Sequence, residues 1–177
     1  MVIKPVKEMI KWVAETSNII LDPDLDSHYL SSAAIVILPN TLNSLSEFLL
    51  YSESVIFKGF RSRDDMIKFA VFAGNLEESS ERIQQNITNA LREDKLFYGI
   101  SESLQKNIPP ALNNYQASVV PFLVVLKRIA NDPGSSIGIE EFLESAMALI
   151  NSGAQLRETS FHELQLLLKR RIENFSQ

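Results

Sequence analysis

Apolar residues recur along most of this chain with the three- and four-residue spacing of an amphipathic α-helix. The clearest stripe lies near the C-terminus and consists of Phe161, Leu164, Leu167, Leu168, Ile172 and Phe175. The segment before it carries a similar stripe, made of Phe142, Leu143, Ala146, Met147 and Ile150. Because this spacing places apolar side chains on one side of a helix, both segments are predicted to be helices that bury one face.

Prolines, glycines and capping residues divide the rest of the chain into further helices. Ser160 and Glu163 form a capping-box pattern, which predicts that the last helix begins there. Pro121 predicts either the first turn of a helix that begins near Ser118 or a kink in a longer helix. The predicted helices cover residues 5–21, 25–38, 41–49, 62–74, 77–93, 111–131, 139–151 and 160–175, with a short helical turn after Ser101.

One predicted segment is ambiguous, because Ile35 to Leu38 has the β-branched composition of a strand as well as the place of a helix end. We favour a helix, since no alternating partner strand lies nearby. The predicted fold is therefore all-α, a compact bundle of about seven or eight helices in a single helical domain, residues 1–177.

Composition and charge narrow the functional classes. The chain has no cysteine, which excludes disulfides, thiolate zinc sites and a cysteine nucleophile. Its formal net charge is −5, whereas free-standing nucleic-acid binders are usually basic. Charged residues interrupt the N-terminal segment, and the longest apolar run, Ala33 to Leu38, is far shorter than the ~20 residues of a membrane span. We expect a cytoplasmic protein with no membrane partner.

Fragments of two known sites occur, and each fails at a defined position. Asp22-x-Asp24-x-Asp26 begins like a calcium loop, but Ser27 and Ala33 stand where glycine and glutamate are needed. His162-Glu163 begins like a zinc-protease helix, but Leu166 replaces the second histidine. No glycine-rich phosphate loop is present. We therefore predict no metal, no cofactor and no catalytic residue, while a site that uses His28 or His162 beside a buried carboxylate stays an alternative.

Basic residues are the remaining candidates for a binding site. Lys58, Arg61, Arg63 and Lys68 cluster around one connector, with Phe57 and Phe60 between them. Such a loop could contact phosphates and stack on bases, although a solvated loop with buried phenylalanines fits the same pattern. Lys127 and Arg128 end another helix, where cations also favour the helix dipole. The predicted nucleic-acid-binding residues are Lys58, Arg61, Arg63, Lys68, Lys127 and Arg128.

Two segments carry a resemblance to a known family. Lys106-x-Ile108-Pro109-x-x-Leu112, followed by Tyr115, Val119 and Phe122-Leu123, resembles a stretch in the small helical subunits of CRISPR effector complexes. The segment from Leu38-Pro39-x-x-Leu42 to Phe48-Leu49 looks similar. The resemblance covers about a tenth of the chain. It implies a subunit that stacks in several copies within a larger complex and holds nucleic-acid backbone, and the acidic net charge departs from that pattern.

The sequence thus favours binding or assembly over catalysis. The first hypothesis is a non-catalytic subunit of a nucleoprotein complex, with other subunits and copies of itself as partners and nucleic-acid backbone as ligand. The alternative is a protein–protein adaptor or regulator that binds through an exposed apolar patch. Candidate patches are the segment Val119 to Leu126 and the surroundings of Trp12.

Overall fold

The computed structural model describes residues 25–58, 62–96, 99–132 and 137–175, and all the elements in these ranges are helical. The first three elements follow one another without a break, and we call them together the first helix: α2 (Leu25–Ser31), the π-helical turn η2 (Ser32–Ile37) and α3 (Leu38–Phe57). The next are α4 (Arg63–Glu93), the short 3-10 turn η3 (Asp94–Leu96), α5 (Glu102–Asn131) and α6 (Ile139–Phe175). The all-α prediction is confirmed for these residues.

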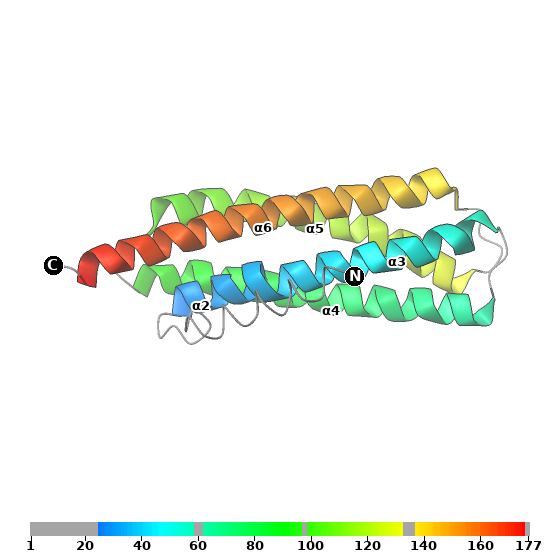
Figure 1. The fold of residues 1–177 in the computed structure, drawn as a ribbon, viewed down its shortest axis with the longest axis horizontal. Helices are drawn as coiled ribbons and strands as arrows, with labels where there is room; N and C mark the ends of the chain where they lie inside the picture. Colours follow the sequence, from blue (N-terminus) through cyan, green and yellow to red (C-terminus); the bar gives the residue numbers. More distant parts are fainter. Residues whose placement is uncertain (1–24, 59–61, 97–98, 133–136, 176–177) are drawn as a thin grey trace.

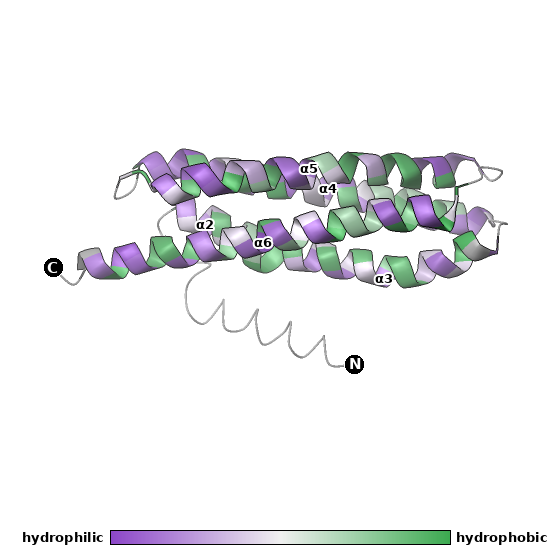
Figure 2. Cartoon of the chain, turned by 90° about the horizontal axis from the view of Figure 1, so that it is seen from above, coloured by the Kyte–Doolittle hydropathy of each residue, from purple (hydrophilic) through white to green (hydrophobic). Residues whose placement is uncertain are grey.

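The described residues form four long helices that lie side by side (Figure 1). The first helix packs against α4 and α6, and α5 packs against the same two helices from the other side. Consecutive helices are therefore neighbours, which is the up-down-up-down arrangement of a four-helix bundle. Hydrophilic and hydrophobic residues alternate along each helix, as one face turns to the core and the other to solvent (Figure 2).

The predicted number of helices, seven or eight, is wrong, because several expected breaks lie inside continuous helices. Pro109 and Pro110, which separate two predicted helices, lie within α5. Pro121 also lies within α5, so of its two predicted places the one in a longer helix holds and the helix start near Ser118 does not. A proline removes the hydrogen bond to the carbonyl four residues before it. For Pro110 and Pro121 those carbonyls belong to Lys106 and Ala117, which are exposed, so water can replace the lost donors. The predicted helix at 5–21 lies outside the described residues.

The first helix passes Pro39 through the π-helical turn. Here the backbone N–H of Leu38 bonds to the carbonyl of Ala33, five residues earlier. The shift of register accommodates the proline without ending the helix. The ambiguous Ile35 to Leu38 segment is thus helical, as we favoured.

The capping box predicted at Ser160 and Glu163 is also wrong. α6 runs without interruption from Ile139 to Phe175, so Ser160 and Glu163 lie in its interior, and both are buried. A true capping box occurs at Ser62, where the Ser62 hydroxyl accepts from the Asp65 backbone and Asp65 accepts from the Ser62 backbone. The predicted start of this helix at residue 62 is thus confirmed.

Residues of all four helices form one apolar core. Leu30 and Leu45 come from the first helix, Ile83 from α4, Leu126 from α5 and Leu156 from α6, and each is fully buried. By length and composition alone the Leu25–Ile56 helix could cross a membrane, with a mean hydropathy of 1.3 in its most apolar window. A bundle core helix meets the same criterion, and this helix supplies core residues.

Two glycines inside helices differ in their surroundings. A Cβ atom at Gly74 would have no neighbour within 4 Å, whereas a Cβ at Gly153 would lie 2.8 Å from Leu42 Cδ2 of the first helix. Gly153 therefore permits the close approach of α6 to the first helix, while Gly74 has no such role.

We expect Gly74→Ala to raise the free energy of unfolding by about 0.5–1 kcal/mol, the cost of glycine in a helix interior. Urea unfolding followed by circular dichroism measures the change. Gly153→Ala is the matched control and should gain less, because Leu42 must move. A larger gain for Gly153→Ala than for Gly74→Ala would contradict this interpretation.

Candidate functional site

The predicted basic residues lie toward the end of the bundle where α3 meets α4, and they fall into two groups. Lys58 follows α3, Arg63 begins α4 and Lys68 lies one turn further along α4; all three are exposed. Arg61, together with Phe60, lies outside the described residues. Lys127 and Arg128 lie in the last turns of α5, which ends at the same end of the bundle.

Acidic and aromatic groups surround the first group. The ammonium of Lys68 lies 4.6 Å from the centre of the Tyr51 ring, a cation–π contact. The Tyr51 hydroxyl donates to Asp65 in the first turn of α4, and burial together with this hydrogen bond raises the pKa of Tyr51 to about 12. Asp64 and Asp65 therefore set negative charge beside these cations, so this end carries both signs.

The second group is paired with carboxylates. Lys127 Nζ lies 3.0 Å from Glu77 of α4, and Arg128 lies 2.9 Å from Glu141 of α6. The four side chains are each about half exposed, so the pairs contribute little stability. A phosphate would have to compete with a carboxylate at both positions.

The start of α4 gives a pH-dependent prediction. The hydrogen bonds from Tyr51 and Ser62 lower the pKa of Asp65 from 3.8 to about 2. A carboxylate with a lowered pKa stabilises the fold above its unfolded value, and this stabilisation disappears as the pH falls through the folded value. We expect Asp65→Asn to cost about 1 kcal/mol at neutral pH, as for other helix caps, with the cost falling as the pH approaches 2 and disappearing below it.

Urea unfolding at several pH values tests this expectation. The matched control is Asp64→Asn, which removes a neighbouring exposed carboxylate that takes no part in the capping box. A cost for Asp65→Asn that stays constant from neutral pH to acid would be inconsistent with the lowered pKa.

The two histidines do not line a common groove. His28 lies in α2 with its ring 5.6 Å from that of Tyr29, and His162 lies on α6 at the rim of a groove that does not include His28. Within the described ranges no group of three or more histidine, aspartate or glutamate side chains could hold a metal ion. Asp22 and Asp24 of the calcium-like fragment lie outside the described residues.

Asp26, the third aspartate of that fragment, forms a buried ion pair with Arg171 near the end of α6. Arg171 also donates to the Ser27 hydroxyl at 2.6 Å. Burial raises the pKa of Asp26, and the Arg171 charge opposes this shift only in part. The pair ties the beginning of the first helix to the end of α6. Sequence reasoning missed it because 145 residues separate the partners.

A groove between α5 and α6 was also missed. Glu163 is fully buried beneath it and accepts hydrogen bonds from Ser103 and Asn107 of α5, at 2.7 Å each. The sequence contained a signal for this arrangement, since the apolar positions Leu156, Leu164 and Leu167 continue one stripe of α6 past Gly153. A single long helix places Glu163 beside that stripe and toward α5.

Large apolar side chains are exposed on all four long helices of the described residues. On the first helix they are Leu25, Val36 and Leu50, and on α4 they are Ile67 and Val71. On α6 they are most numerous: Leu143, Met147, Phe161, Leu166 and Ile172, with exposures of 38%, 49%, 45%, 39% and 67%. On α5 they are Val120 and Val124, within the Val119 to Leu126 segment that the sequence offered as a patch; Val119, Phe122 and Leu126 of that segment are buried. Trp12, the other predicted patch, lies outside the described residues.

Comparison of this chain with protein-family models, with curated proteins and with solved structures gives no match. The resemblance to small CRISPR subunits therefore stays a prediction.

Proposed function

We propose that this chain is a non-catalytic assembly subunit that binds an amphipathic helix of a partner protein along α6. The observation that carries the proposal is a row of apolar side chains on one flank of that helix, which we call the α6 flank. It consists of Leu143, Met147, Ile150, Ala154, Phe161, Leu168 and Ile172.

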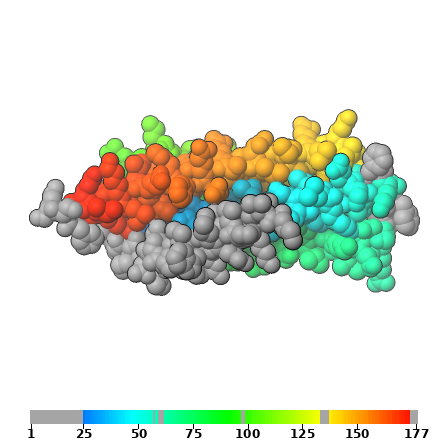
Figure 3. All heavy atoms as spheres, viewed as in Figure 1, coloured from blue at the N-terminus to red at the C-terminus, as the bar shows by residue number. Residues whose placement is uncertain are grey.

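The α6 flank has the geometry of a helix-binding seam. Successive residues of the flank are three, four or seven positions apart in the sequence. These spacings keep their side chains on one side of the helix. Ile150 and Leu168 are half-buried against the core, so the flank is continuous with the packed interior. α6 lies along one edge of the face shown in Figure 3, beside the first helix. Exposed apolar side chains grouped along one side of a helix are a pattern of interaction sites.

The positive charge of Arg157 indicates that the partner helix carries an acidic residue. Arg157 lies in the middle of the α6 flank, is exposed, and forms no ion pair with a described carboxylate. A partner helix with an apolar stripe and one central glutamate or aspartate would pair with Arg157 while burying Met147 and Phe161.

Photo-crosslinking tests the proposal directly, because the natural chain has no cysteine. A single cysteine at position 147 carries the photo-crosslinker, and a cysteine at exposed Glu78 of α4 is the matched control. The expected product, formed only at position 147, joins it to an amphipathic helical segment that contains an acidic residue. Phe161→Glu should abolish this product without changing the melting temperature. A crosslinked segment without such a stripe, or equal products at both positions, would overturn the proposal; a crosslink to a second copy of this chain would assign the flank to self-association.

A second candidate function is the nucleoprotein subunit that the sequence suggested, in the cytoplasm and with nucleic-acid backbone as ligand. It is favoured by Lys58, Arg63 and Lys68, which gather at one end of the bundle and are not ion-paired with described carboxylates. Binding of labelled RNA or DNA should then weaken with salt and fall when these three residues become alanine. The carboxylate-paired Lys127 and Arg128, replaced by alanine, are the control and should matter less. Unchanged binding in the triple variant would exclude this site.

A further inference from the structure

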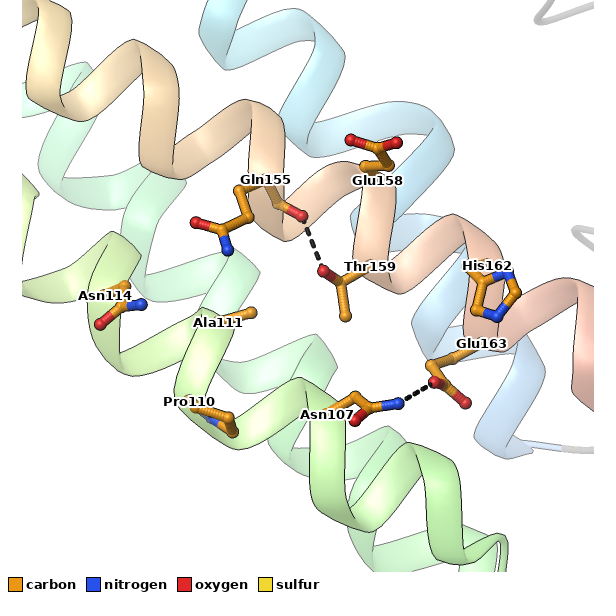
Figure 4. A pocket seen from close by; sticks show the side chains of 9 residues that line it. All are labelled: Asn107, Pro110, Ala111, Asn114, Gln155, Glu158, Thr159, His162 and Glu163. Carbon is orange, nitrogen blue, oxygen red and sulfur yellow. Dashed lines mark hydrogen bonds between the residues drawn. The ribbon is translucent and has the colours of Figure 1, made fainter.

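The groove between α5 and α6 has the features of a site for a cationic side chain. Its cavity has a volume of about 500 Å³ (Figure 4). Asn107 and Asn114 line it from α5, and Gln155, Glu158 and His162 line it from α6. No lysine or arginine is among the described residues that line it.

Glu163 sets the direction of the Asn107 carboxamide. The Asn107 Nδ2 group donates to Glu163 Oε1 at 2.7 Å, so the Asn107 carbonyl oxygen points away from the carboxylate (Figure 4). The Ser103 hydroxyl donates a hydrogen bond to the other carboxylate oxygen, Glu163 Oε2, at 2.7 Å. Asn107 therefore presents a hydrogen-bond acceptor, with a buried negative charge directly behind its amide.

The other polar groups of the groove are available to a ligand. The side chains of Asn114, Gln155 and Glu158 form no hydrogen bond or ion pair with any described residue. Each of them offers at least one acceptor oxygen. The groove thus combines three carboxamides, one exposed carboxylate and one buried carboxylate, and its described lining contributes no permanent positive charge.

We propose that this groove binds the guanidinium group of an arginine from a partner polypeptide. A guanidinium is planar and has five N–H donors, which suits several acceptors spread over two helices better than a single ammonium does. The buried Glu163 supplies attraction without direct contact, and Glu158 contacts the cation at the rim. The site lies on the α5 side of α6 and is independent of the α6 flank, so it stands or fails separately from the proposed function.

The experiment titrates the full chain, labelled with ¹⁵N, with blocked arginine amide, and uses blocked citrulline amide as the neutral probe of the same shape. Side-chain amide signals of Asn107, Asn114 and Gln155 should shift with arginine and not with citrulline. Glu158→Gln should weaken arginine binding about tenfold, the loss of one charge-assisted hydrogen bond. Glu78→Gln on α4 is the matched control and should change nothing.

Glu163→Gln removes the buried charge and keeps the amide shape, and it should also weaken binding of arginine amide. If this variant does not fold, the outcome rests on Glu158→Gln, because Glu158 is exposed and has no structural partner among the described residues. Equal shifts with arginine and citrulline, shifts outside the groove, or unchanged affinity in Glu158→Gln would each overturn the proposal.

Discussion

Replacing Asp26 with leucine is expected to lower the free energy of unfolding by about 3–5 kcal/mol, the usual cost of removing one partner of a buried ion pair. The side chains of Arg171 and Asp26 are 8% and 2% exposed. A guanidinium keeps its charge at any ordinary pH, so Arg171 would remain buried without its carboxylate. Urea unfolding followed by circular dichroism measures the loss.

One further variant separates charge from shape at this position, and a second compares the buried pair with an exposed one. Asp26→Asn should cost less, because its amide oxygen can still accept from Arg171. The raised pKa of Asp26 points the same way: the folded state holds a proton on this group more readily than the unfolded chain does, so its own contribution to stability increases as the pH falls. Lys127→Met breaks an exposed pair and should cost at most about 1 kcal/mol. If Asp26→Leu costs no more than Lys127→Met, the pair is not a structural tie.

The sequence predicts the class of fold because apolar spacing is a local property. The stripes at 142–150 and 161–175 both lie on α6, and each was predicted correctly as helix. What failed was the prediction of breaks. Whether a helix ends at Gly153 or Pro110 depends on whether neighbouring helices or water satisfy the backbone there, and a local pattern does not contain that information.

The candidate sites also depend on contacts between distant residues, which a local sequence pattern does not contain. The pattern around Lys127 and Arg128 identifies two cations, but Glu77 lies 50 residues from Lys127 and only packing brings them together. Glu163 fits a capping box by spacing alone. Its actual partners on α5, Ser103 and Asn107, lie at least 56 residues away in the sequence.

An aromatic cluster joins all four helices toward the end of the bundle where α3 meets α4. Phe48 of α3 stacks on Phe72 of α4 at 3.9 Å and meets Phe69 edge-on at 5.0 Å. Phe142 of α6 connects the cluster to α5, since its ring lies 6.3 Å from Phe69 and 5.5 Å from Phe122. Because the rings are in contact from helix to helix, this cluster sets the spacing of the helices at that end.

We expect Phe142→Ala to lower the free energy of unfolding by about 3–5 kcal/mol, as for other fully buried phenylalanines. The ring has no exposed surface and touches aromatic rings of two other helices, so its removal leaves a cavity that rigid neighbours fill poorly. Urea unfolding provides the value. A cost below that of a typical surface substitution would mean that the helices can close around the gap.

Phe161→Ala is the matched control on the same helix. Phe161 is 45% exposed, so its truncation should change the stability of the isolated protein by less than about 1 kcal/mol. The two variants together separate the faces of α6: one phenylalanine holds the bundle, and the other is free to hold a partner. If Phe161→Ala destabilised the isolated chain as much as Phe142→Ala, the α6 flank would be part of the core, and the docking proposal would lose its main support.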